Sequence, residues 1–274
     1  MSKTIKKNID IDSHYQLTQE QISFYQENEF IKLKNVLSPE TLAHYRQIIW
    51  DKTLALNTNT LAMEERSTYD KAFIQVINLW QENDRVKEFV LGKTLARIAS
   101  ELMQVSGVRL YHDQALFKEA SGGFTPWHAD QQYWPLSSHK TITAWIPLQA
   151  VSLDMGPLSF AAGSQHDQTY RDLAISDDSE MVIQKAMNDY PIECAAFDIG
   201  EISFHSGWMY HRAPANKTNE TRGVMTIIYM DEAMKLKEPE NPNQENDRRC
   251  FLPGIEVGQI ANSPLNPIIY SQAF

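Results

Sequence analysis

The sequence predicts an α+β fold with a mainly β core, a sandwich or jelly-roll barrel with helices packed at its N-terminal end. In the first third of the chain, apolar residues recur at helical spacing, as in Leu95, Ile98, Ala99 and Leu102. From Gly107 onward, short alternating segments are separated by turn-forming residues. Many short strands with turns between them are typical of sandwiches and jelly rolls.

No linker-like stretch divides the chain, so one domain is expected over residues 1–274. The helical N-terminal part is expected over about residues 17–105, and the jelly-roll core over about residues 107–270. Residues 1–16 are polar and are predicted to be a frayed leader.

The first two helices carry readable start signals. Thr18 and Gln21 have the spacing of a capping box, which predicts a helix to about residue 28. Residues 30–36 then alternate like a short strand. Ser38 followed by Pro39 gives an N-cap and a proline at the first helical position, so a second helix is expected to about residue 56.

The next stretch is less patterned. Residues 57–70 predict a flexible or substrate-facing loop, and residues 72–105 are mostly helical in composition. Residues 235–249 are charged and contain proline, which predicts a surface excursion. The strands of the core are expected at residues 108–117, 142–148, 192–197, 201–204 and 224–230.

Composition narrows the class of protein. The net charge of −10 argues against a general nucleic-acid binder and against docking on an anionic membrane, since no basic surface would neutralise phosphates. Two cysteines, Cys194 and Cys250, are too few for a disulfide framework or a cysteine-based zinc site. No long apolar stretch predicts a membrane span or a signal core, so cytoplasmic residence is expected. The oligomeric state stays undetermined.

One motif suggests chemistry. His128 and Asp130 form the only His-x-Asp of the chain. Residues two apart in a strand point to the same face, so both side chains can bind one ion. A third ligand is expected from the later segment that carries His205 and His211, and His211 is the preferred candidate. Two histidines and one carboxylate can hold one face of a ferrous ion and leave positions open.

Arg222 follows His211 by eleven residues, and its guanidinium can clamp a carboxylate with two parallel hydrogen bonds. Together these residues predict a mononuclear iron oxygenase. The alternative is structural, because a single His-x-Asp occurs often by chance and a histidine in an apolar strand is commonly a core residue. The remaining candidates, His112, His139 and His166, are interpreted as structural.

Several separate motifs then resemble one family, the phytanoyl-CoA dioxygenases, over roughly residues 15–270. Their order and spacing agree with the family, which makes the resemblance specific. The matching segments are residues 127–130, 143–148, 155–158, 163–166, 204–211, Asn216, Arg222 and 261–267.

This resemblance implies a double-stranded β-helix, a cupin-like jelly roll, that uses Fe(II), 2-oxoglutarate as co-substrate and O2. It assigns iron, and therefore the catalytic centre, to His128, Asp130 and His211, and it favours His211 over His205. It assigns the distal carboxylate of 2-oxoglutarate to Arg222. The further co-substrate contacts that it implies are Gln114, Trp145 and, less directly, Gln75.

The expected activity is a dioxygenase that oxidises a C–H bond of a small organic molecule, in the simplest case by hydroxylation, with release of succinate and CO2. Gln131, Tyr133, Trp134 and Trp208 are predicted to contact the substrate, with Trp127 and Gln132 as further candidates, although all of them also suit a barrel core.

Two other classes of function compete with this one. The first is a non-catalytic metal-binding β-barrel that senses or stores a small ligand, and the second is a degenerate interaction scaffold. A halogenase is disfavoured, because Asp130 occupies the position that a halide would need.

Overall fold

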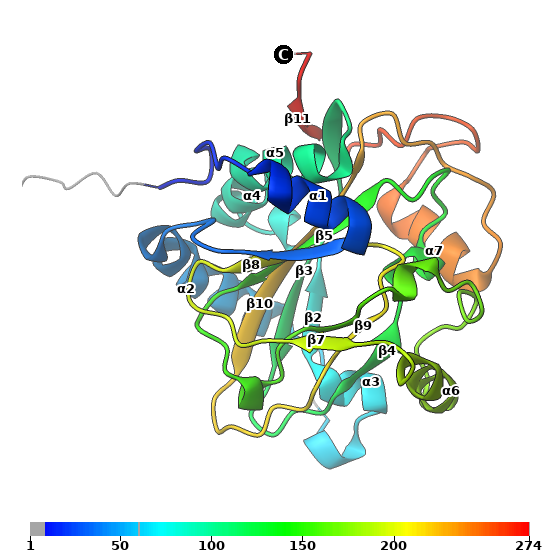
Figure 1. Cartoon of the computed structure of the whole chain (residues 1–274). Coiled ribbons are helices and arrows are strands. Elements are labelled where there is room, and N and C mark those ends of the chain that lie inside the picture. Colours follow the sequence, from blue (N-terminus) through cyan, green and yellow to red (C-terminus); the bar gives the residue numbers. More distant parts are fainter. Residues whose placement is uncertain (1–8, 60, 274) are drawn as a thin grey trace, which may run out of the picture.

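The computed structural model describes residues 9–59 and 61–273. Two antiparallel sheets face each other, as expected for a jelly roll (Figure 1). The large sheet has the order β1-β8-β5-β10-β3-β11, with β2 also paired to β3, and the small sheet has the order β4-β9-β6-β7. The strands are β1 (Phe30–Leu33), β2 (Ile74–Ile77), β3 (Gly107–Lys118), β4 (Thr125–His128), β5 (Thr141–Pro147), β6 (Ser159–Ala161), β7 (Ile192–Cys194), β8 (Ile202–Ser206), β9 (His211–Ala213), β10 (Arg222–Asp231) and β11 (Ile268–Ser271).

The helices are α1 (Gln19–Asn28), α2 (Pro39–Leu56), α3 (Thr68–Ala72), α4 (Asp84–Val90), α5 (Lys93–Met103), α6 (Asp177–Met187) and α7 (Pro242–Phe251). Helices α1, α2, α4 and α5 lie in the N-terminal third and pack on the large sheet, whereas α3 and α6 contact β4 of the small sheet and α7 contacts the turn that follows β4. The predicted apolar stripe of α5 is buried against the large sheet. None of the helices in the described ranges is both long and apolar enough to span a membrane.

The N-terminal start signals act as predicted. Thr18 caps α1 through a complete capping box, and Ser38 caps α2 with Pro39 in its first turn. The predicted frayed leader is partly wrong, because Ile11 is buried and its carbonyl accepts a hydrogen bond from the backbone N–H of Thr94. Residues 1–8 of that prediction lie outside the described residues.

Two segments differ from expectation. The stretch expected to be mostly helical contains β2, because its β-branched residues complete a ladder along β3, and such pairing overrides local composition. The expected surface excursion contains α7, which Asn241 caps and Pro242 opens. One face of α7 lines the cavity between the two sheets.

Candidate metal and co-substrate site

The register of the small sheet builds the centre of the site. Strands β4 and β9 pair with His128 directly opposite His211, so the two imidazole rings lie 4.2 Å apart between their centroids. Both rings face a cavity of about 310 Å³ between the sheets. The two predicted histidines are therefore brought together as directly opposed residues of two antiparallel strands.

Backbone carbonyls fix the orientation of both rings. The Nδ1 atom of His128 lies 2.8 Å from the carbonyl oxygen of Pro126, and that of His211 lies 2.9 Å from the carbonyl oxygen of Met209. An Nδ1–H that donates to a carbonyl leaves Nε2 as the free lone pair, which is how histidine is commonly held for metal binding.

Asp130 completes the group. It opens the short 3-10 turn Asp130–Tyr133 directly after β4. Its Oδ1 atom lies 3.5 Å from Nε2 of His128 and 3.8 Å from Nε2 of His211. One ligand atom from each of the three residues lies within 4.8 Å of the others, which suits a single metal ion. The structure thus brings together the three ligands expected from the sequence.

The other oxygen of Asp130 faces the large sheet. Its Oδ2 accepts a hydrogen bond of 3.4 Å from the hydroxyl of Thr143 and lies 3.6 Å from Nε2 of His205. Thr143 and His205 are paired across β5 and β8. The competing candidate His205 therefore lies behind the carboxylate, outside the three-residue group, and its ring centroid is 4.4 Å from that of His211.

Burial sets the protonation states. Desolvation lowers the pKa of His128 and of His211 to about 4, so both rings are neutral at neutral pH. Burial alone would raise the pKa of Asp130, but interaction with His211 and the other nearby histidines outweighs it and holds that pKa below its ordinary value. Neutral imidazoles beside an ionised carboxylate are the forms that bind a metal.

Arg222 stands at the other end of the cavity, at the start of β10. It is fully buried, and one guanidinium N–H donates to the carbonyl oxygen of Gly156 while the group lies over Trp145, 5.4 Å from the ring centroid. Its Nε has no hydrogen-bond partner, and no carboxylate of the described residues lies within 4 Å of it. Burial lowers its pKa to about 9, so the group stays cationic at neutral pH.

The carbonyl that meets Arg222 comes from a tight approach of two loops. Gly156 has a φ of +70°, and a Cβ there would lie 2.1 Å from the carbonyl oxygen of Pro214. Only glycine fits this conformation and this contact without strain. A buried guanidinium with an unpaired N–H inside a cavity suits a carboxylate ligand, and the family resemblance assigns the distal carboxylate of 2-oxoglutarate to it.

The other expected co-substrate contacts also line this cavity. Trp145, Gln114 and Gln75 all face it. Tyr69 donates a 3.1 Å hydrogen bond to Gln75, which donates one of 2.8 Å to Gln114.

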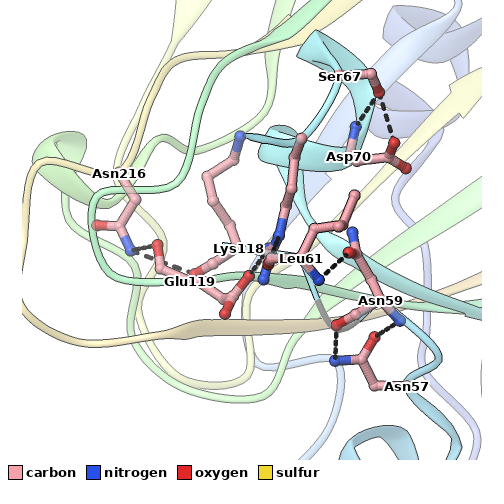
Figure 2. Close-up of polar contacts among 9 residues, drawn as sticks. Asn57, Asn59, Leu61, Ser67, Asp70, Lys118, Glu119 and Asn216 are labelled. Atoms are coloured by element: carbon pink, nitrogen blue, oxygen red, sulfur yellow. Dashed lines mark hydrogen bonds and ion pairs between the residues drawn. The ribbon is translucent and has the colours of Figure 1, made fainter. Parts of the chain in front are cut away.

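The segment that carries Tyr69 is tied to the end of β3 (Figure 2). Arg66 forms an ion pair with Glu119, and its Nε donates a 2.9 Å hydrogen bond to the carbonyl oxygen of Leu61. Asn216 donates to the carbonyl oxygens of Lys118 and Glu119 from the other side. The predicted flexible or substrate-facing loop is therefore braced, and it contributes Tyr69 to the cavity lining; we call residues 61–72 the braced wall.

The predicted substrate residues divide into two groups. Tyr133 and Trp134 line the cavity. Gln131 does not, because its side chain accepts a 2.7 Å hydrogen bond from Thr141. Trp208 also lies elsewhere, under the guanidinium of Arg171. The further candidate Trp127 is fully buried against α6 and hydrogen-bonded to Gln184.

Sequence reasoning missed the wall of the cavity that α7 forms beside the turn of Asp130. His112, interpreted as structural, shares its strand face with Gln114 and lines the cavity. Asp247 on α7 lines it too. The capping pair Asn241-Pro242 was a readable signal for this helix.

Solved structures with a similar fold were found. The carbocyclase SnoK from nogalamycin biosynthesis is 23% identical, with 93% of this chain and 97% of that chain covered and a TM-score of 0.76. The epimerase SnoN, in complex with Fe3+, alpha ketoglutarate and nogalamycin RO, is 21% identical over 92% and 98% of the two chains, with a TM-score of 0.75. EctD from S. alaskensis, with 2-oxoglutarate and 5-hydroxyectoine, is 16% identical over 94% and 92%, with a TM-score of 0.72. These similarities show a shared fold.

No curated protein matches the chain. The model of one protein family does, under the description phytanoyl-CoA dioxygenase, over residues 25–224. This range includes β4, β9 and the first residues of β10, which carry the metal group and Arg222. Since the match spans well over half of the sequence, the protein belongs to the phytanoyl-CoA dioxygenase family.

Proposed function

We propose that this protein is an Fe(II)- and 2-oxoglutarate-dependent oxygenase that oxidises a C–H bond of a small organic molecule, by hydroxylation in the simplest case. The observation that carries the proposal is the pairing, in one cavity, of the His128, Asp130 and His211 group with a buried Arg222 that has no carboxylate partner among the described residues. Family membership supports it.

The residues present fit both groups. His128, Asp130 and His211 would hold Fe(II), and Arg222 would hold the distal carboxylate of 2-oxoglutarate. Bound there, these groups supply the oxidation of the substrate by O2, with release of succinate and CO2. The chain itself keeps both imidazoles neutral, fixes their tautomer through backbone carbonyls, and aims Oδ1 of Asp130 at the shared position.

The cavity walls place the substrate. The apolar residues Leu158, Phe73 and Trp145 line it together with Tyr133 and Trp134, and an apolar lining of this kind would limit the access of water. The net charge of −10 fits a small molecule better than a nucleic acid as partner. Similar structures include a carbocyclase, an epimerase and one holding 5-hydroxyectoine, so ring formation and epimerisation are the alternatives to hydroxylation for this fold.

The test is an anaerobic titration with Fe(II) and then 2-oxoglutarate, followed by the visible charge-transfer band of the ternary complex. The wild type is expected to develop the band, and His128→Ala is not. Succinate release on admission of O2 with a panel of small molecules then separates an enzyme from the competing function, a metal-binding barrel that stores or senses a ligand. Such a barrel would bind iron and leave 2-oxoglutarate unconsumed.

A further inference from the structure

Helix α7 forms the wall of the cavity next to the metal group. Its residues Asn246, Asp247, Cys250 and Phe251 all line the cavity, at the spacing of one helix face. The buried side chain of Gln244 donates a 3.1 Å hydrogen bond to the carbonyl oxygen of Gln132, in the turn that Asp130 opens. The position of α7 relative to the metal ligands is therefore fixed by the protein.

Asp247 is an incompletely paired carboxylate on this wall. It is only 8% exposed. Tyr111 donates a 3.2 Å hydrogen bond to its Oδ2, and Oδ1 receives none from the described residues. No Lys, Arg or His of the described residues lies within 4 Å of it, although a buried ionised carboxylate is costly unless a cation or several donors compensate it.

The surroundings of Asp247 add no positive charge. His112 lines the same cavity, stacked on Phe251 with 4.2 Å between the ring centroids, and desolvation lowers its pKa to about 4. Burial, together with the charge of Asp130, raises the pKa of Asp247 to about 7. Among the described residues, no cationic side chain therefore pairs with Asp247.

A purely structural role does not account for this arrangement. The hydrogen bond from Tyr111 joins α7 to β3, but the ring of Tyr111 already packs against Phe251 at 5.6 Å between centroids. A neutral amide would accept the same hydrogen bond without the desolvation cost of a carboxylate. Aromatic side chains, including Tyr133 and Trp134, line the same cavity as Asp247. Their faces attract a cation, and they offer an apolar surface to the carbon atoms attached to it.

We propose that Asp247 binds a protonated amine of the prime substrate, so that the substrate class is a small amine with an apolar or cyclic body. The ammonium group would donate to Oδ1 of Asp247 and pair with its charge, while the rest of the molecule extends between the aromatic side chains toward the metal group. This inference rests on the proposed function, since it names the substrate class of the same cavity.

The test compares benzylamine with benzyl alcohol, two probes with the same skeleton. Their dissociation constants are measured by ligand-detected NMR on protein loaded anaerobically with Fe(II) and 2-oxoglutarate, at a pH above the pKa of Asp247. Paramagnetic relaxation of the probe by iron reports binding inside the cavity. The wild type is expected to bind the amine at least about tenfold more tightly than the alcohol.

Asp247→Asn keeps an acceptor for Tyr111 and is expected to lose this preference. Glu245→Gln is the matched control, because Glu245 is an exposed acid on the same helix that pairs with Arg248. It removes the same charge outside the cavity and should keep the preference.

Equal binding of the two probes by the wild type, failure of benzylamine to bind it, or a preference that survives in Asp247→Asn would each overturn the inference. The comparison on the wild type stands even where the variant does not fold. The titration with Fe(II) and 2-oxoglutarate on the same samples separates the two failures. If the wild type binds both but shows no amine preference, only the substrate class is wrong.

Discussion

Asp130 shows at the residue scale how one side chain connects the two sheets. Its Oδ1 faces the two histidines of the small sheet, and its Oδ2 faces Thr143 and His205 of the large one. His205 therefore lies on the side of the carboxylate away from the shared metal position. This placement favours His211 as the proposed ligand and gives His205 a position from which it can orient Asp130.

We predict that His211→Ala loses iron binding and succinate production, whereas His205→Ala retains most of its iron affinity. The reason is that only His211 presents Nε2 to the same point as His128 and Oδ1 of Asp130. Iron affinity is measured by anaerobic titration, and thermal unfolding serves as the control for folding. The ligand assignment would be contradicted if His205→Ala produced no succinate while His211→Ala kept full activity.

The grouping of the proposed metal ligands could be anticipated from sequence, because two of the three residues are close together in the chain. His128 and Asp130 are two residues apart, so their shared direction follows from strand geometry alone. Asp247 and His112 gave no such signal, because their meeting depends on where α7 docks. The burial of an acid cannot be read from a charged, proline-containing segment.

At the scale of elements, the braced wall before β2 contributes Tyr69 to one side of the cavity. The ion pair of Arg66 with Glu119 anchors it, with side chains 8% and 30% exposed. We predict that Glu119→Gln speeds amide hydrogen exchange in residues 61–72 by roughly fivefold, since a partly exposed pair contributes about 1 kcal/mol. Global unfolding should change little.

The matched control for this experiment is Glu88→Gln, which breaks the more exposed pair of Arg85 with Glu88 on α4. It should leave exchange in the wall unchanged. Faster exchange spread over the entire protein in Glu119→Gln would instead mean that the pair supports the fold as a whole.

Asp113 connects β3 to the turn Leu79–Gln81. Its carboxylate accepts hydrogen bonds of 3.1 and 3.3 Å from the backbone N–H groups of Leu79 and Trp80, and burial raises its pKa from 3.8 to about 7. Between these two values the folded state keeps a proton that the unfolded state releases. The free energy of unfolding contributed by this group therefore falls as pH rises through that window.

We predict that Asp113→Asn removes this dependence. The unfolding free energy of the wild type minus that of the variant should fall by up to roughly 4 kcal/mol between about pH 4 and pH 7 and stay level above it. Urea unfolding at several pH values measures it, and the other titrating groups cancel because both proteins share them. A difference that grows with pH would contradict the assignment.

Elements with local start signals were predictable, and elements made by pairing were not. The capping residues of α1 and α2 directly precede these helices in the sequence, so they can be recognised there. Strands such as β6 and β9 have only three residues each and exist because a neighbour completes their hydrogen bonds. β2 was not predicted within the stretch expected to be helical, because it too depends on pairing with a neighbour, β3.

At the scale of the whole molecule, the jelly roll places the two halves of the site on different sheets. His128 and His211 belong to β4 and β9 of the small sheet, and Arg222 belongs to β10 of the large one. The sequence pattern predicted a sandwich or jelly-roll core, and the family resemblance predicted a double-stranded β-helix. The arrangement of the two sheets around one cavity depends on the pairing of strands that are far apart in the sequence. It could therefore not be predicted from any short segment.

This division predicts how ligands stabilise the fold. Fe(II) would be held by residues of the small sheet and its exit turn, whereas 2-oxoglutarate would be held by Arg222 of the large sheet, so that the two ligands together would connect the sheets. We predict that anaerobic Fe(II) raises the melting temperature, that 2-oxoglutarate raises it further only with metal present, and that Arg222→Ala keeps the first rise and loses most of the second. A ligand at about 100 times its Kd stabilises by about 2.7 kcal/mol, which differential scanning fluorimetry resolves.

The Arg222→Ala variant should also need at least about tenfold more 2-oxoglutarate, since truncating one partner of a buried charged pair commonly costs roughly 2–5 kcal/mol. An equal 2-oxoglutarate rise in Arg222→Ala and wild type would remove Arg222 from the co-substrate site and leave the metal group without its proposed partner.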